Sequence, residues 1–213
     1  VSHYGRHGAR GMTGSKHFKY VIGKMDSAQT KGWLTEKGEE ILARVKVAAA
    51  DACHRDGDLT RLGARQHQGI ARRLSQNYPE LLMQPITVKA NSSTVRRCML
   101  SMANFCQELK ALNPQLNVTM DASEHDMYYL IPNDSIFIPG KGCDNALYEK
   151  LDSFRHEKLN GRRQIALLFK DPKAVEGWID GYKFCDALWN IVSDMECLPE
   201  LGLKFNDLFT DDE

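Results

Sequence analysis

Residues 85–122 constrain the fold more than any other stretch, because strand, helix and strand patterns follow one another there. "PITVKANS" (85–92) is rich in β-branched residues and alternates, and "QLNVTMDA" (115–122) reads as a second short strand. Between them, residues 95–112 carry an apolar stripe at helical spacing, made of Val95, Cys98, Met99, Met102, Phe105 and Leu109. Strands that alternate with helices favour a mainly parallel sheet, so we predict an α/β fold.

Two further helices are predicted upstream, each beginning after a threonine. Thr35 is a candidate N-cap for a helix that follows it, and Thr60 for a second helix with apolar residues at helical spacing. Each threonine belongs to the motif "LT-x-x-G", the only internal repeat in the chain. We predict a strand end at residues 1–5 and a long loop at 6–34, where Gly, Lys and Ser are frequent.

The pattern changes after residue 123, where we place a domain boundary. Residues 124–146 contain prolines and glycines and read as irregular, whereas 147–198 look mostly helical, with core candidates Trp178, Phe184, Leu188 and Trp189. We therefore expect residues 1–123 to form the N-terminal part of an α/β core and residues 124–213 a helical cap. We expect the core to resume beyond the end of this chain.

The overall composition points to no charged macromolecular partner. The 213 residues contain 28 Lys and Arg against 28 Asp and Glu, so the formal net charge is zero. Such a balance does not favour nucleic acid or an anionic membrane, and any attraction for anions must be local. The six cysteines form no C-x-x-C pair, so we predict neither a zinc site nor another cofactor. No apolar run approaches the roughly 18 residues of a membrane span, and no signal peptide is visible.

The strongest chemical signal is "GRHGAR" at residues 5–10. Its glycines allow a sharp turn and close approach to a ligand, while Arg6 and Arg10 offer planar forks that match phosphate oxygens. Neighbouring guanidinium groups disfavour a metal cation and lower the pKa of His7, which favours a neutral, nucleophilic imidazole. A solvated basic turn is the alternative interpretation.

A second signal is "SSTVRRCMLSMANF" at residues 92–105, at the expected start of a helix just after a strand. A helix N-terminus presents free N–H groups and a positive dipole end, which suit an anion. Arg96 or Arg97 would add a charge-assisted contact there. The alternative is that both arginines are solvated.

Together, "RHGAR", the "LT-x-x-G" repeat and "SSTVRRCMLSMANFCQEL" resemble the histidine phosphatase superfamily, over roughly residues 1–123. The branch that they resemble is that of the histidine acid phosphatases and phytases, multiple inositol polyphosphate phosphatases above all. The resemblance implies a three-layer, phosphoglycerate mutase-like core with a helical cap. It also implies a periplasmic or secreted monomer that hydrolyses small phosphate esters without a metal.

Motif by motif, the resemblance implies a set of site residues. His7 matches the nucleophile that becomes phosphohistidine, Arg6 and Arg10 match two phosphate-binding arginines, and Arg97 matches the third, with Arg96 the less favoured choice. Where many members continue with Tyr-Pro-Thr, this chain has Gly11-Met12-Thr13. Thr13 is therefore a substrate-side candidate, and Lys16 is another for a second phosphate, or else a mobile surface lysine.

The superfamily's proton donor, in a late His-Asp or His-Ala-Glu motif, has no convincing match. His125-Asp126 has the letters but comes before the cap rather than after it, so we expect the donor outside this chain. Basic cap residues Lys141, Arg162 and Arg163 suit a polyphosphorylated substrate such as phytate, although a solvated charge run is the commoner interpretation. Two alternative functions remain open, a phosphoglycerate mutase-like phosphotransferase and a non-catalytic phosphate-binding relative.

Overall fold

The computed structural model describes residues 2–130, 145–158 and 160–209 of the chain. It divides into two compact units, each built from two separate stretches of sequence. The first unit comprises Val1–Gly11 and Gly57–Lys141, and the second comprises Met12–Asp56 and Gly142–Glu213.

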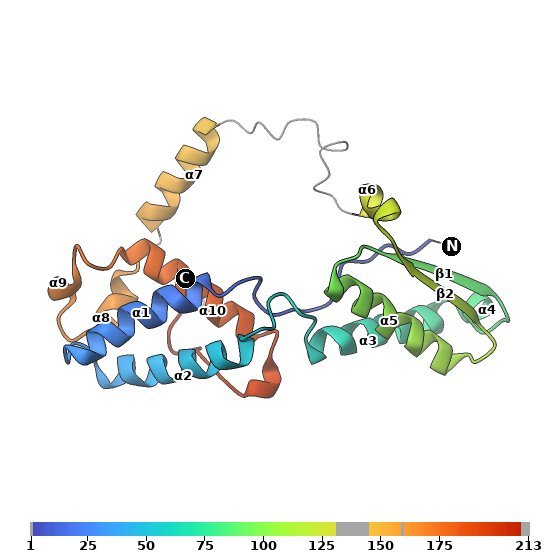
Figure 1. Ribbon diagram of the computed structural model, residues 1–213, viewed down its shortest axis with the longest axis horizontal. Coiled ribbons are helices and arrows are strands. Elements are labelled where there is room, and N and C mark those ends of the chain that lie inside the picture. The colour runs from blue at the N-terminus through green and yellow to red at the C-terminus, as the bar shows by residue number, and fades with distance from the viewer. Residues whose placement is uncertain (1, 131–144, 159, 210–213) are drawn as a thin grey trace. The chain divides into compact units, whose positions relative to one another are not determined.

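The first unit is an α/β unit around a small parallel sheet (Figure 1). Strands β1 (Thr87–Ser92) and β2 (Asn117–Ala122) pair in parallel, and α5 (Arg96–Leu112) connects them and packs on both. This is the strand–helix–strand order that the sequence predicts. Helix α3 (Arg61–Asn77) packs along α5. Three short helical elements complete the described part of the unit, α4 (Pro79–Leu82), η1 (Glu124–Asp126) and α6 (Met127–Leu130).

A small apolar core joins α3, α5 and the sheet in this unit. Its fully buried members are Ala71, Leu109 and Leu116, with Leu82 nearly so. Apolar residues of both strands pack against these four residues, which fixes how α5 lies on the sheet. The position of α5 matters because its first turn carries Arg97 and its second carries Ser101.

The elements of the second unit are all helices in the part of it that the structure describes. Its helices are α1 (Lys16–Thr30), α2 (Glu36–Ala52), α7 (Asn145–Lys158), α8 (Arg162–Leu168), α9 (Pro172–Val175), α10 (Gly181–Met195) and η2 (Pro199–Leu201). Helix α1 packs against α2 and α10, and α8 packs against α2, α9 and α10. Phe184 and Leu188 are fully buried in its core, as predicted, and Trp178 packs against that core. Trp189 is 47% exposed, so its assignment to the core is wrong; it stacks edge-on against Phe209 at the surface instead.

The repeated motif "LT-x-x-G" occurs once in each unit, where it joins the start of a helix to another backbone segment. In the first unit Leu59 forms an antiparallel bridge with Arg10, and the backbone N–H of Thr60 donates to the carbonyl of Ala9. In the second unit Leu34 bridges Phe169, and the Thr35 N–H donates to the carbonyl of Leu168.

The end of each motif also has the same geometry. Both threonine hydroxyls accept the N–H of the glycine three residues on, which caps the helix. A Cβ on Gly38 would lie 2.3 Å from the Leu168 carbonyl oxygen, and one on Gly63 would lie 2.2 Å from that of Ala9. The glycine of the motif therefore lets the N-terminus of a helix make direct backbone contact with another segment of the chain.

Three predictions about the first 123 residues differ from the structure. Residues 2–7 form no strand; the backbone of residues 6–9 bonds to side chains of α3 and α5 instead. The loop expected at 6–34 contains helix α1, whose buried Phe18, Val21, Met25 and Ala28 follow helical spacing despite Gly23 between them. Because that apolar face packs on α2 and α10, residues 12–56 join the helical unit, whereas the boundary near residue 123 placed them in the core.

Candidate phosphate-binding site

The segment that carries His7 is held by its backbone in the first unit. Downstream of His7, Arg10 bridges Leu59 and the N–H of Gly11 donates to the Asp58 carbonyl at 3.0 Å. The hydroxyl and the N–H of Thr60 both donate to the carbonyl of Ala9, at 3.1 and 3.0 Å. The loop is therefore tied directly to the start of α3.

Gly8 and Gly63 bring this loop and α3 into backbone contact. A Cβ on Gly8 would lie 2.4 Å from the Gly63 carbonyl oxygen, a separation that real Cβ atoms essentially never show. Gly8 is thus required by packing against α3, and not only by approach of a ligand.

His7 is fixed in one ring orientation and one tautomer. Its Nδ1 lies 2.8 Å from the carbonyl oxygen of Gly8. A carbonyl oxygen only accepts, so Nδ1 carries the proton in the neutral ring and Nε2 keeps its lone pair. The nitrogen away from the backbone is therefore the basic, nucleophilic atom.

The surroundings of His7 favour its neutral form. Partial burial lowers the pKa of His7 below its ordinary value, and the positive charges of Arg97, Arg6 and Arg10 lower it further, against the bond to Gly8. The structure therefore brings together all four residues predicted to be catalytic. Among the described residues, no carboxylate forms an ion pair with any of the three arginines.

The two adjacent arginines of α5 differ in their contacts. The exposed Arg96 extends to Asp58, with its Nη2 3.2 Å from the carboxylate. Arg97 is partly buried, its charge acts on His7, and its buried Nε has no hydrogen-bond partner in the described part of the chain. A buried guanidinium nitrogen without an acceptor is costly, and a bound anion would satisfy it. The geometry favours Arg97 over Arg96 as the residue that faces the site.

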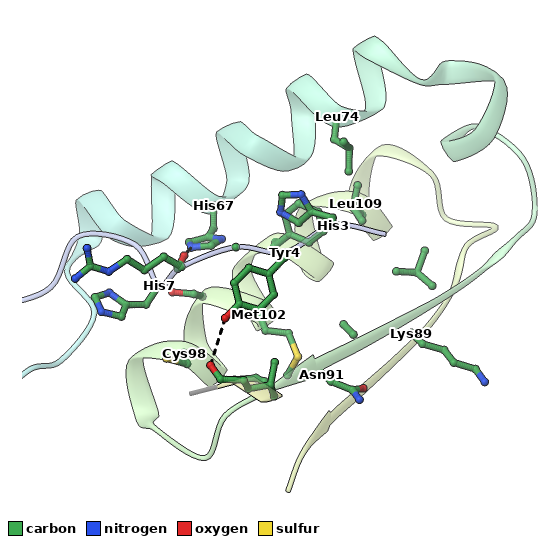
Figure 2. Close-up of a pocket in the computed structure, with 18 of the residues that line it drawn as sticks. His3, Tyr4, His7, His67, Leu74, Lys89, Asn91, Cys98, Met102 and Leu109 are labelled. Atoms are coloured by element: carbon green, nitrogen blue, oxygen red, sulfur yellow. Dashed lines mark hydrogen bonds between the residues drawn. The ribbon is translucent and has the colours of Figure 1, made fainter. Parts of the chain in front are cut away.

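A cavity of about 530 Å³ opens beside His7 in the same unit. It lies between the N-terminal segment, α3, α5 and β1, and Figure 2 shows His3, Tyr4 and His67 along it. Arg6 and His7 line one end, and the remaining lining is mixed, with apolar residues such as Leu74, Ile86 and Leu109 beside polar ones such as Lys89 and Asn91. The hydroxyl of Tyr4 donates to the Leu130 carbonyl at 3.4 Å (Figure 2).

The remaining candidates from the sequence belong to other elements of the chain. Thr13 and Lys16 belong to the second unit, at the start of α1, and their contact with substrate stays a prediction. His125 and Asp126 lie in η1, after β2.

The structure gives no common role to the three basic residues predicted for the cap. Lys141 lies outside the described residues, and Arg162 is exposed at the start of α8. Arg163 donates to the carbonyl of Leu208 at 2.9 Å, so this arginine holds the C-terminal segment of its own unit.

Three residues that support the loop were missed at the level of sequence. His67 Nε2 donates to the Arg6 carbonyl at 3.1 Å, Gln66 Oε1 accepts from the Ala9 N–H at 2.8 Å, and Ser101 Oγ accepts from the Gly8 N–H at 3.1 Å. The signal was there in part, because Gln66 interrupts the apolar spacing of α3 and Ser101 lies one turn after Arg97.

The part of the chain that the structure describes offers neither a cluster of metal ligands nor a helix that could span a membrane. No group of three or more His, Cys, Asp or Glu side chains there could hold a metal ion. Nor is any described helix both long and apolar enough to cross a membrane.

Comparison with known proteins gives a structural neighbour and no sequence relative. No protein-family profile matches the chain, and no curated protein sequence matches it. The fold is similar to the crystal structure of a multiple inositol polyphosphate phosphatase from Bifidobacterium longum in complex with inositol hexasulfate, with a TM-score of 0.70 at 15% identity. The match covers 97% of this chain and 59% of that chain, so the present chain spans about three fifths of its neighbour's length. The similarity shows a shared α/β fold with a helical subdomain.

Proposed function

We propose that the chain carries the phosphate-binding and nucleophilic part of a phosphomonoester hydrolase. The observation that carries this proposal is the cluster around His7: a neutral imidazole with its Nε2 lone pair available, beside three arginines with no paired carboxylate among the described residues. Such a cluster attracts a phosphate dianion and places a nucleophile next to it.

The reaction follows from these positions in two steps. Nε2 of His7 attacks phosphorus in line, so an N–P bond forms while the P–O bond to the leaving alcohol breaks. Arg6, Arg10 and Arg97 stabilise the charge on the equatorial oxygens. The leaving oxygen takes a proton from a general acid that is not among the residues assigned here. Water then attacks phosphorus, which releases inorganic phosphate and returns the electron pair to Nε2.

Inositol polyphosphates such as phytate are the substrate class that we propose. Support comes from the neighbouring structure, which is named as an inositol polyphosphate phosphatase and holds a hexasulfate. The end of the cavity at Arg6 and His7 suits such a polyanion best, because apolar side chains such as Leu74, Leu82 and Ile86 form part of the other walls. We therefore expect one phosphate to lie between His7 and the arginines, with the ring pointing away from the apolar walls.

Trapping of the covalent intermediate tests the proposal. Incubation with a phosphomonoester, followed by alkaline quenching and mass spectrometry, should add one phosphoryl group to the peptide that contains His7. His7→Ala should remove the label, whereas His17→Ala, a change at another partly buried histidine of lowered pKa, should keep it. Phosphate binding without any label on His7 would instead support a non-catalytic phosphate-binding relative. Transfer of the label to a second sugar phosphate would support a phosphotransferase.

A further inference from the structure

We propose that Gln66 is a positioning residue for His7, acting through the single peptide group that joins Gly8 to Ala9. This inference rests on the proposed function, because it assigns how the nucleophile is held. It concerns a side chain on α3 that lies one peptide away from the imidazole.

The peptide between Gly8 and Ala9 is bonded at both of its polar atoms. Its carbonyl oxygen accepts the Nδ1–H of His7 at 2.8 Å, and its N–H donates to Oε1 of Gln66 at 2.8 Å. One planar group therefore connects the glutamine to the ring. Rotation of that plane would break both bonds together, so the acceptor on Gln66 fixes the direction in which the Gly8 carbonyl points.

The direction of that carbonyl decides the chemistry of His7. With the carbonyl against Nδ1, the proton stays on Nδ1 and the lone pair stays on Nε2. Hydrogen bonds in such a chain also polarise one another, so an acceptor at the amide end makes the carbonyl end a better acceptor. Loss of the Gln66 oxygen should weaken the preference for the Nδ1–H tautomer.

The preceding peptide is held separately, which leaves Gln66 with one defined task. The N–H of Gly8 donates to Oγ of Ser101 at 3.1 Å. Ser101 lies on α5, one turn beyond Arg97, so it sets the separation between the loop and that arginine. Gln66 on α3 instead sets the plane of the next peptide.

Gln68 offers a matched control on the same helix. Its Nε2 donates to Oδ1 of Asn104 at 3.2 Å, so it also makes a hydrogen bond to a side chain of α5, but it has no bond to the loop. Gln68→Leu therefore removes a comparable bond between α3 and α5 and leaves the peptide after Gly8 untouched.

The test is the tautomer of His7, read by two-bond ¹H–¹⁵N NMR of the labelled protein at a pH of about 8, above the ordinary histidine pKa. Wild type should show mainly the Nδ1–H form. Gln66→Leu should lower the ratio of Nδ1–H to Nε2–H roughly fivefold, as expected for one lost hydrogen bond. Gln66→Glu, which keeps an acceptor oxygen, should retain the wild-type ratio, and so should Gln68→Leu.

An unchanged ratio in folded Gln66→Leu, or an equal change in Gln68→Leu, would overturn the assignment. If Gln66→Leu does not fold, Gln66→Asn withdraws the oxygen by one methylene and should show the same change; an unchanged ratio there overturns the assignment as well. With p-nitrophenyl phosphate, Gln66→Leu should lower kcat roughly fivefold and leave KM unchanged. A change of tautomer with no phosphoryl label on His7 in the wild-type protein would refute the proposed function while leaving the positioning assignment in place.

Discussion

Replacement of Gly63 by alanine tests whether α3 and the His7 loop depend on backbone contact. The new Cβ would lie 2.2 Å from the carbonyl oxygen of Ala9 and 2.9 Å from its nitrogen. The Leu59 Cδ1 also lies 2.7 Å away and can move aside, whereas the two Ala9 atoms are backbone and cannot. To restore an ordinary contact of 3.4 Å, Ala9 would have to move away from the new Cβ. That movement would break the hydrogen bonds of Ala9 to Gln66 at 2.8 Å and to Thr60 at 3.0 Å.

The expected magnitude follows from those bonds. Two lost hydrogen bonds cost about 1–3 kcal/mol, and a Gly-to-Ala change within a helix returns about 0.5–1 kcal/mol. Gly63→Ala should therefore lower the free energy of unfolding by roughly 1.3 kcal/mol, the difference between the midpoints of these two ranges. Gly69→Ala, in the same helix, meets only the flexible end of Arg73 at 3.3 Å and should raise it by about 0.5–1 kcal/mol.

Urea unfolding followed by far-UV circular dichroism measures both changes, and hydrogen exchange over residues 57–77 shows whether they arise in α3. Tryptophan emission provides a control, because Trp33, Trp178 and Trp189 all belong to the second unit and should be unaffected in the folded variants. Gly63→Ala with the stability of wild type, or a larger loss in Gly69→Ala, would refute the argument from contact.

Two further predictions concern charge around the loop. Arg97→Ala should weaken the binding of inorganic phosphate by roughly 10-fold to 100-fold, as expected for a lost charged hydrogen bond. Arg96→Ala should weaken it by far less, because Arg96 is exposed and pairs with Asp58. Isothermal titration calorimetry measures both affinities, and the reverse order would show the reasoning to be mistaken. Burial lowers the pKa of His67 below the ordinary 6.5, so below pH 6.5 the unfolded chain binds more protons than the folded one and stability should fall as the pH drops. His67→Gln, which keeps a donor for the Arg6 carbonyl, should make this fall less steep. Urea unfolding at several pH values measures it, and an equal dependence of stability on pH in the two proteins would contradict the prediction.

Secondary structure could be predicted from the sequence where it depends on interactions between residues close together in the chain. The β-branched run at 87–92, the stripe of α5 and the threonine caps of α2 and α3 each depend on neighbours within a few residues, and each is present in the structure. The residues around His7 could be predicted in kind, because guanidinium groups beside an imidazole already indicate an anion.

What could not be predicted depends on partners distant in sequence. Helix α1 belongs to the second unit because it packs against α10, which is more than 150 residues away in the sequence. No local pattern predicts that packing. The sequence predicts a strand end at residues 1–5, but no local pattern reveals that side chains from α3 and α5 instead bond to the backbone of the segment that follows. Gln66 lies at helical spacing with the apolar residues of α3, and no local pattern indicates that its oxygen accepts the Ala9 N–H.

The pKa of His7, measured by NMR titration with and without inorganic phosphate, tests the central claim most directly. Without phosphate it should lie below the ordinary histidine value of 6.5, because burial and three arginines disfavour the imidazolium. Phosphate bound among those arginines should raise the pKa of His7, since a neighbouring dianion favours the charged ring, and Arg97→Ala should reduce that rise. A pKa that is ordinary in the free protein and does not change with phosphate would contradict the assignment of this cluster as a phosphate site.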